Sequence, residues 1–319
     1  MSKRLPDRVA ARILLGAASS AIAILALITV FIFREGLPVI IDRGPLSFIA
    51  GMRWAPSQGE YGLLPMIAGS AVVTAGALLL GLPLGIACAI TLAEMAPPRA
   101  RTVLKPTIEL LAGIPSVVYG FIGMEVLVPF IRENPAFGGA GYSALAASVI
   151  LAVMVLPTIV GISIDAIEAV PHSFREGSRA LGATQWQTIA GVVLPAARSG
   201  IVAGVILGIG RAVGETMAVI MVAGNSVRMP HSLLDPVRTL TANIALEMGY
   251  ASGAHAQALF ATGIVLFIIS LALNELAGRA RRRRRVTQTV PEPTLTTAET
   301  RAELLGGDNA PPLGREHFA

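Results

Sequence analysis

Long apolar runs, each separated from the next by a short polar segment, dominate the chain and decide its fold class. A helix needs about 20 apolar residues to cross the hydrocarbon core of a bilayer. Six segments meet this requirement, so the pattern predicts an all-α, polytopic membrane protein with six transmembrane helices. The predicted spans are Ile13–Phe33, Leu64–Leu92, Ile108–Phe130, Tyr142–Ile164, Gly200–Ala223 and Ala258–Leu276. The first is longer than a signal-peptide core and lacks a small-residue cleavage site, so we expect it to be retained.

The basic residues between the spans fall mainly on one side of the predicted membrane. Counted as far as Arg285, sixteen Lys and Arg residues lie on the side that holds both termini, and six lie on the other. Because cytoplasmic loops carry the excess of positive charge, both termini are predicted to be cytoplasmic. The chain then consists of a cytoplasmic arm (1–12), a transmembrane domain (13–279) and a cytoplasmic tail (280–319). The tail starts with arginines that would anchor on anionic lipid, and its remaining composition predicts disorder.

Composition supports the membrane assignment and removes several kinds of function. Hydrophobic residues make up 54% of the 319 residues and charged residues 14%, against about 25% charged in soluble domains. Cys88 is the only cysteine, and the sequence has no metal-ligand cluster or redox motif. It also has no phosphate-binding loop of the G-x-x-x-x-G-K-[ST] type and no catalytic constellation. We therefore expect a membrane protein without a cofactor and not an enzyme.

The segment between the fourth and fifth spans, residues 170–200, predicts more than a simple loop. Ser173 with Glu176, and Thr184 three residues before a glutamine, match the capping box that opens a helix. Gly182 lies where a left-handed residue would end the first helix. We therefore expect two short cytoplasmic helices joined by a tight turn. They would form either an amphipathic loop packed on its own spans or a docking element for a cytoplasmic partner. DNA recognition is disfavoured between two membrane spans.

This segment resembles the signature loop of the membrane subunits of bacterial ABC importers with the type I permease fold. That pattern begins Glu-Ala-Ala, continues through a Gly and ends in an aliphatic residue, a spacer, Leu and Pro. Here "EGS" stands in place of "EAA", and Val192 takes the aliphatic position. The resemblance implies that the loop fits a cleft on an ATPase subunit and transmits its closure. The implied coupling residues are Glu176, Gly177, Ser178, Gly182, Ala183, Leu194 and Pro195.

Three further stretches narrow the resemblance to the permeases of phosphate importers. They are "LAGIPSVVYGF" (111–121), "ALGATQWQTIAGVVLPAA" (180–197) and "GIGRAVGETMAVIMVAGN" (208–225). The "WAP…YGLLP" loop favours the PstC type over the PstA type, and the resemblance covers roughly residues 10 to 280. It implies ATP-driven import of inorganic phosphate across the cell inner membrane. The implied partners are a second permease (PstA-like), two ATPase subunits (PstB-like), a periplasmic or extracellular phosphate-binding protein (PstS-like) and membrane lipid, with no nucleic acid.

Two full charges, Arg211 and Glu215, lie inside the predicted fifth span. On a continuous helix they would share one face with Gly200, Gly204 and Gly208, a glycine spacing that favours close helix packing. One interpretation is a structural ion pair that locks this span to a neighbour. The other is a selective site in the substrate pathway, where Arg211 binds an oxyanion and Glu215 holds Arg211 between substrates. We favour the second, because charges inside a membrane usually serve function and both residues match the phosphate-permease motif.

Other features leave alternatives open. Gly113 and Pro115 predict a kink in the third span, either for packing or at the pathway. Glu125 is a second candidate for the pathway, and His231 and His255 are expected to be surface loop residues. A permease for another oxyanion such as sulfate remains an alternative function. So do an ion-driven secondary transporter or channel, for which no inverted repeat is seen, and a membrane scaffold or sensor with a purely structural ion pair.

Overall fold

The computed structural model describes residues 7–137 and 139–285. The chain divides into two units, residues 1–278 and 279–319, and the account below concerns the first unit together with the helix that runs out of it. The predicted arm (1–12) is described from Asp7 onward. Of the predicted tail (280–319), the part beyond residue 285 lies outside the described residues.

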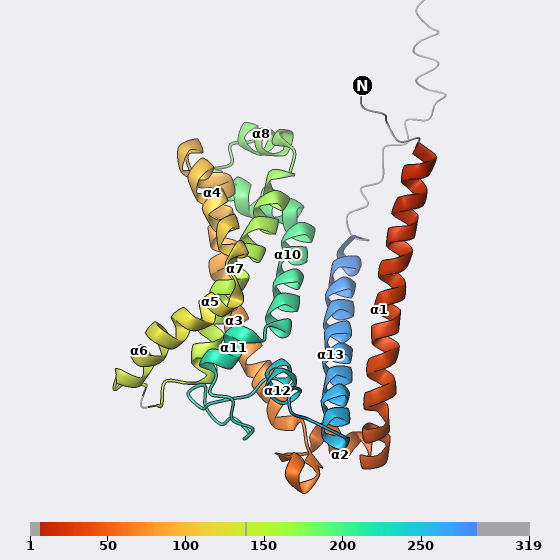
Figure 1. The fold of residues 1–319 in the computed structure, drawn as a ribbon. Coiled ribbons are helices and arrows are strands. Elements are labelled where there is room, and N and C mark those ends of the chain that lie inside the picture. The colour runs from red at the N-terminus through yellow and green to blue at the C-terminus, as the bar shows by residue number, and fades with distance from the viewer. Residues whose placement is uncertain (1–6, 138, 286–319) are drawn as a thin grey trace, which may run out of the picture. The chain divides into compact units, whose positions relative to one another are not determined.

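Most of the described chain is helical (Figure 1). The helices are α1 (Asp7–Arg43), α2 (Pro45–Ala50), α3 (Leu64–Ile90), α4 (Pro98–Gly113), α5 (Ser116–Ile122), α6 (Val128–Glu133), α7 (Ala144–Glu168), α8 (His172–Ala180), α9 (Gln185–Thr188), α10 (Leu194–Gly214), α11 (Met217–Val222), α12 (Leu240–Glu247) and α13 (Ala254–Arg285). Turns of π-helix at η2 (Thr91–Met95), η3 (Gly123–Leu127) and η4 (Ile189–Val193) extend α3, join α5 to α6 and join α9 to α10. A 3-10 turn, η1 (Pro56–Gln58), links the antiparallel strands β1 (Trp54–Ala55) and β2 (Glu60–Tyr61).

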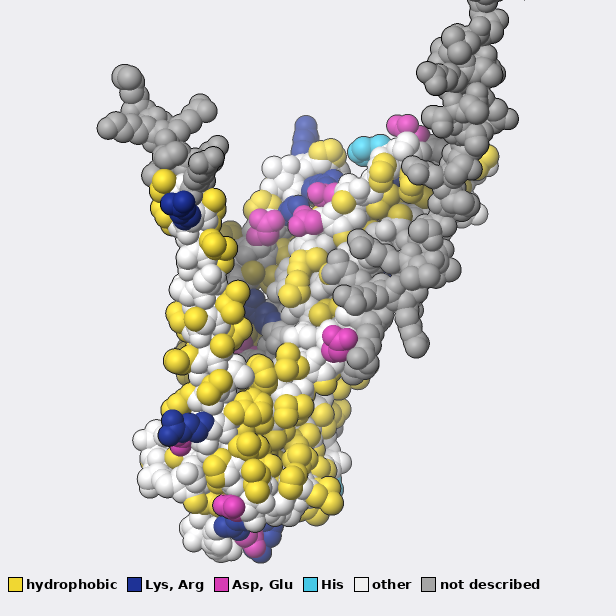
Figure 2. Space-filling model, turned by 90° about the vertical axis from the view of Figure 1, so that its right-hand side faces the viewer, with side chains coloured by type: hydrophobic (Ala, Val, Ile, Leu, Met, Phe, Trp, Pro, Cys, Tyr) yellow, Lys and Arg dark blue, Asp and Glu magenta, His cyan; other side chains and the backbone are white. Residues whose placement is uncertain are grey.

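The all-α prediction with six spans is confirmed in the described residues. Five helical segments are long and apolar enough to cross a membrane, and a bent pair makes a sixth if it is one span. Figure 2 shows hydrophobic side chains over the middle of the visible face, with most charged side chains toward its two ends. The five segments are Ala11–Arg43, Leu64–Met95, Ala144–Glu168, Gln185–Gly214 and Ala254–Glu275, and the pair is Pro98–Gly113 with Ser116–Glu133.

The third span is broken, not merely kinked as predicted. The axes of its two halves differ by 94° on either side of Ile114 and Pro115. In a continuous helix the N–H of residue 115 would bond the carbonyl of Leu111, but proline has no N–H. The Tyr119 hydroxyl donates a hydrogen bond to this carbonyl at 2.8 Å instead. The break is therefore stabilised by a side chain from the next turn.

The fifth span also differs from the prediction of one helix over Gly200–Ala223. It starts earlier, at Gln185, and α10 ends at Gly214. Glu215 has extended backbone (φ −69°, ψ 133°), and α11 begins two residues later. The Thr241 hydroxyl donates to the Glu215 carbonyl at 2.9 Å. A contact from α12 therefore holds the carbonyl that a continuous helix would have used internally.

The centre of the bundle is α7, which packs against α3 and α10 with much of its length buried. The glycine face predicted on α10 lies against it: an added Cβ at Gly208 would be 2.8 Å from Ile159 Cγ1, and one at Gly204 would be 3.2 Å from Ile162 Cβ. The prediction of close helix packing through these glycines is confirmed. On α3, Gly85 faces the same Ile159 in the same way.

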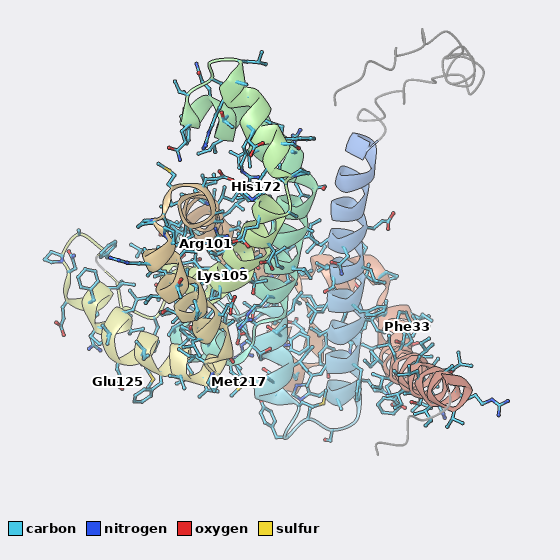
Figure 3. All side chains as sticks on the ribbon, turned by 90° about the horizontal axis from the view of Figure 1, so that it is seen from above. Phe33, Arg101, Lys105, Glu125, His172 and Met217 are labelled. Atoms are coloured by element: carbon cyan, nitrogen blue, oxygen red, sulfur yellow. The ribbon has the colours of Figure 1, made fainter. Side chains whose placement is uncertain are left out.

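Helices α1 and α13 pack along each other through contacts between aromatic side chains. The rings of Phe31 and Phe260 meet edge to face at 5.4 Å, as do those of Phe33 and Phe267 at 6.3 Å. In Figure 3, Phe33 lies on α1. At Gly36 the two backbones come so close that an added Cβ would be 2.6 Å from the backbone nitrogen of Ala261. Only glycine fits this approach.

Candidate functional site

The structure separates the two predicted pathway charges. Arg211 lies in the last turn of α10, whereas Glu215 lies in the extended segment that follows. The Glu215 carboxylate accepts a hydrogen bond from the backbone N–H of Ala218 at 3.3 Å, at the start of α11. No ion pair joins Arg211 to Glu215 in the described chain. Both side chains are half-buried. Because the helix ends between them, the i, i+4 geometry of the sequence prediction is wrong.

The Arg211 guanidinium has neither a hydrogen-bond partner nor an ion-pair partner among residues 7–137 and 139–285. Its charge acts electrostatically on the hydroxyl of Tyr119, the side chain that stabilises the break in the third span. A position in the last turn of a helix suits a cation, because the helix dipole is negative there. Arg211 is therefore a positively charged side chain in a membrane-spanning segment, and its N–H donors make no hydrogen bond within the described residues.

The two broken spans meet through α5 and α11. An added Cβ at Gly120 would lie 2.9 Å from the Cα of Ala218, and one at Gly123 would lie 2.9 Å from Val222 Cγ1. Met217, the first residue of α11, is labelled in Figure 3. Glu125, the other pathway candidate from the sequence, is exposed in η3. The segments that follow the two breaks therefore pack against each other, whereas the Glu125 side chain is exposed.

A buried polar cluster lies at the end of the helices opposite α8 (Figure 1). The carboxylate of Glu247 accepts hydrogen bonds from Trp54 Nε1 at 2.8 Å and Arg238 Nη1 at 2.6 Å, and it contacts His255 Nε2 at 2.8 Å. Arg238 also donates to Asn243 Oδ1 at 3.1 Å. The expectation of a surface position is therefore wrong for His255, whose side chain is 16% exposed.

The predicted loop histidine His231 is indeed exposed. Its backbone N–H donates to the Asp235 carboxylate at 2.8 Å, and the N–H of Ser232 does so at 2.9 Å. These two bonds hold the pKa of Asp235 below its ordinary value. Among the described residues, no group of three or more His, Cys, Asp or Glu could hold a metal ion.

The predicted two-helix loop is present as α8 and α9. The capping box at Thr184 is confirmed: the N–H of Gln187 donates to the Thr184 hydroxyl at 3.3 Å, and the N–H of Thr184 donates to Gln187 Oε1 at 2.8 Å. Gly182 has the predicted left-handed backbone, with φ of 84°. The capping box at Ser173 is wrong, because α8 starts from Pro171 without any side-chain cap. The N-cap is Pro171, two residues before the predicted Ser173, and its φ of −57° lies in the range that the proline ring fixes.

The second loop helix is not a short separate helix as expected. The chain continues through η4 into α10, with Pro195 in the first turn after the π-helical turn. Because proline has no N–H to donate to the preceding turn, the irregular hydrogen bonding of the π-helical turn fits this position. Of the predicted coupling residues, Glu176, Gly177, Gly182 and Pro195 are exposed, and Ser178, Ala183 and Leu194 are half-buried.

Three large apolar side chains stand exposed on this loop, and the sequence analysis missed them. Phe174 is 51% exposed, Leu181 91% and Trp186 61%. At Gly177, an added Cβ would meet nothing within 4 Å. The signal in the sequence that could have predicted this exposure is the presence of isolated apolar residues in a strongly polar segment. These side chains are therefore accessible to a partner of the loop.

Comparison with known proteins defines the class. The chain belongs to the family described as binding-protein-dependent transport system inner membrane component, which matches residues 81–286. It is therefore the permease component of an ABC importer, a transport subunit and not a catalytic one. Membership of this family implies ATPase and substrate-binding-protein partners.

Among individual relatives, the chain is 47% identical to the probable ABC transporter permease protein YqgH of Bacillus subtilis (strain 168), over 76% of this chain and 80% of that protein. It is 39% identical to the phosphate transport system permease protein PstC of Xylella fastidiosa (strain Temecula1), over 73% and 77%. It is 35% identical to the probable phosphate transport system permease protein PstC of Methanocaldococcus jannaschii, over 78% and 85%.

Solved structures support the fold. A chain of a bacterial ABC transporter that imports the acidic polysaccharide alginate aligns with a TM-score of 0.59 and 17% identity, covering 87% of this chain and 98% of that one. A chain of the MetNI methionine ABC transporter, in an inward-facing conformation, aligns with a TM-score of 0.52 and 23% identity, covering 73% and 97%. At these identities the comparison establishes the ABC-importer permease fold.

Proposed function

We propose that this chain is the phosphate-translocating permease subunit of an ATP-driven importer in the cell inner membrane. The observation that carries the proposal is the Arg211 guanidinium, which lies in a spanning segment without a partner in the described chain. An arginine in the middle of a membrane helix costs about 2.5–3.5 kcal/mol on insertion scales. A passing oxyanion would offset that cost, and the planar fork of donors suits a phosphate. The relatives named as phosphate permeases support this choice of anion.

In the proposed mechanism, Glu215 and the two broken spans shape the site. One break precedes α5 and the other precedes α11. Together with Tyr119, these breaks place Arg211 next to backbone that is not part of a continuous helix. Irregular backbone at membrane depth is tolerated where it borders a cavity or is buried in protein. Glu215 repels a dianion, which keeps the site from trapping its substrate. It also holds Arg211 in another state of the cycle, once its carboxylate leaves the N–H of Ala218.

The loop of α8 and α9 couples this site to ATP hydrolysis. Its predicted coupling residues, from Glu176 to Pro195, would enter a cleft on one of the two PstB-like ATPase subunits, with Leu181 and Trp186 supplying apolar contact. A PstA-like permease would complete the membrane unit, and a PstS-like binding protein would deliver phosphate. Both termini would be cytoplasmic, on the side of the coupling loop.

The test is uptake of radiolabelled phosphate by vesicles that carry the assembled complex, with labelled sulfate as the competing oxyanion. Arg211→Ala should lower phosphate uptake at least tenfold, because it removes charge-assisted hydrogen bonds worth about 1.5–3 kcal/mol each. Arg12→Ala, an exposed arginine on α1, is the matched control and should leave uptake unchanged. Copurification of the ATPase subunits checks assembly.

Other results would point elsewhere. Normal uptake by both Arg211→Ala and Arg211→Lys would refute the role of Arg211 in the pathway. Preference for sulfate would favour the permease of another oxyanion. Uptake by the chain without ATPase subunits would favour an ion-driven secondary transporter.

A further inference from the structure

A buried ion pair joins the coupling loop to the end of a membrane helix. Nη2 and Nε of Arg175, on α8, donate to Glu94 Oε1 at 2.6 and 3.1 Å. The two side chains are only 11% and 8% exposed. A buried ion pair is costly unless its remaining donors and acceptors are also satisfied. Its surroundings therefore decide what the pair does.

The remaining donors of Arg175 bond to backbone carbonyls at the end of α7. Nη1 donates to the Val170 carbonyl at 2.6 Å, and Nη2 donates to the Ile167 carbonyl at 2.9 Å. Carbonyls at the C-terminal end of a helix lack internal partners and favour a cation. A single guanidinium thus fastens α8 to α7 and, through Glu94, to α3.

A second bond attaches the other helix of the loop to the same residue. Gln185 Nε2, at the start of α9, donates to the backbone carbonyl of Glu94 at 3.0 Å. The hydroxyls of Ser178 and Thr188 hydrogen-bond at 3.0 Å and tie α8 to α9. Glu94 itself lies in η2, which continues α3 without interruption. Both helices of the loop therefore act on α3 through one position.

Contacts from this position reach the candidate pathway without a gap. Ile159 of α7 packs against Gly85 of α3 on one side and Gly208 of α10 on the other. Gly208 lies one turn before Arg211 on the same helix. A chain of packed rigid helices of this kind can carry a displacement between distant sites.

We infer that Glu94 and Arg175 form the joint through which movement of the coupling loop reaches α3 and α7. The inference rests on the proposed function, since it concerns how the importer couples ATP hydrolysis to transport. Both are positioning residues: they act through the helices and touch neither substrate nor nucleotide. Neither belongs to the coupling residues that the family resemblance supplied.

A matched control lies at the same end of the bundle. Arg101 of α4 pairs with Glu168 of α7, and Lys105 pairs with Asp165 at 3.0 Å. Arg101 and Lys105 are labelled in Figure 3. These pairs join α4 to α7 but do not involve the coupling loop. Glu168→Gln therefore removes a charge from a more exposed ion pair, whose side chains are 37% and 32% exposed, while leaving the joint intact.

The first readout is the amount of phosphate imported per ATP hydrolysed by the complete complex in vesicles. Glu94→Gln removes the charge, and Arg175→Lys keeps the charge but loses the fork of donors. Both should lower the ratio at least fivefold while ATP hydrolysis continues, as loss of a typical coupling free energy does. Glu168→Gln should leave the ratio unchanged. An unchanged ratio in both joint variants, or an equal fall in the control, overturns the inference.

The second readout does not depend on the substrate. Hydrogen exchange of α3 and α7 is compared in the complex with and without a non-hydrolysable ATP analogue. Wild type and Glu168→Gln should show a change in protection at residues 86–95 and 160–168, which both joint variants lose. If wild type imports no phosphate but this loss is seen, the proposed substrate fails and the joint stands. If the joint variants keep the change, the joint is refuted whatever the substrate.

Discussion

Replacement of Glu247 by Gln should strongly destabilise the buried cluster of Glu247, Arg238, Trp54 and His255. The glutamine keeps the shape of the side chain, but its amide nitrogen cannot accept a hydrogen bond. It can therefore serve only one side of the cluster: Arg238 at 2.6 Å, or Trp54 and His255 at 2.8 Å each. It also leaves Arg238 as a buried cation without its counter-charge.

The expected size of the effect follows from burial. The side chains of Glu247 and Arg238 are 9% and 16% exposed, so water screens their attraction only weakly. Removal of one member of a buried pair costs about 3–5 kcal/mol. The control is Glu60→Gln in the same region. Glu60 pairs with Arg53 at 3.6 Å, and their side chains are 43% and 74% exposed. Such surface pairs contribute about 0–1 kcal/mol.

Denaturant unfolding in detergent, followed by tryptophan fluorescence, measures the difference. The chain has two tryptophans, Trp54 and Trp186. A Trp186→Phe background therefore isolates the signal of Trp54, which is buried within the cluster. Glu247→Gln should lower the free energy of unfolding by about 3–5 kcal/mol relative to that background. A loss no larger than that of Glu60→Gln would refute the reasoning.

Two other predictions concern a helix contact and a loop. Gly36→Ala should destabilise the protein by about 1–3 kcal/mol in thermal unfolding, because its Cβ would be 2.6 Å from the backbone nitrogen of Ala261. Gly16→Ala on the same helix is the control, because its added Cβ meets nothing within 4 Å. It should be neutral or slightly stabilising, and an equal loss of stability in both variants would contradict the packing argument. Since backbone N–H bonds lower the pKa of Asp235, its carboxylate stabilises the 231–235 turn at neutral pH. This contribution should be lost as the pH falls through the lowered pKa, below 3.8. The rate of pepsin cleavage in the turn should therefore rise in wild type as the pH falls through this pKa. Asp235→Asn has no carboxylate to titrate and should not show this rise.

Local signals in the sequence were sufficient for most of the fold. The apolar runs predicted the spans, and the second one begins at Leu64 as expected. The capping box at Thr184 and the left-handed Gly182 both depend on residues within one helical turn. The glycines of α10 predicted a close helix contact, because a missing Cβ has the same meaning wherever the partner lies.

Features that depend on distant residues escaped the sequence. No proline lies at the break at Glu215, so the local sequence does not predict it. The hydroxyl that donates to the Glu215 carbonyl belongs to Thr241, 26 residues later. Arg175 and Glu94 are 81 residues apart, and no local pattern in the sequence links them. The same holds for the cluster around Glu247, whose bond to Trp54 spans 193 residues.

The bond from Thr241 to Glu215 has a consequence for biosynthesis. The ribosome makes the chain from its N-terminus, so the segment up to Val222 reaches the membrane before Thr241 exists. Without that hydroxyl, the Glu215 carbonyl must find its donor within the segment itself, as lipid demands of every backbone group. The nascent segment is therefore expected to enter the bilayer as one unbroken helix. It would break only when the later-made α12 folds back against it, so synthesis of α12 times a late step in the maturation of the membrane domain.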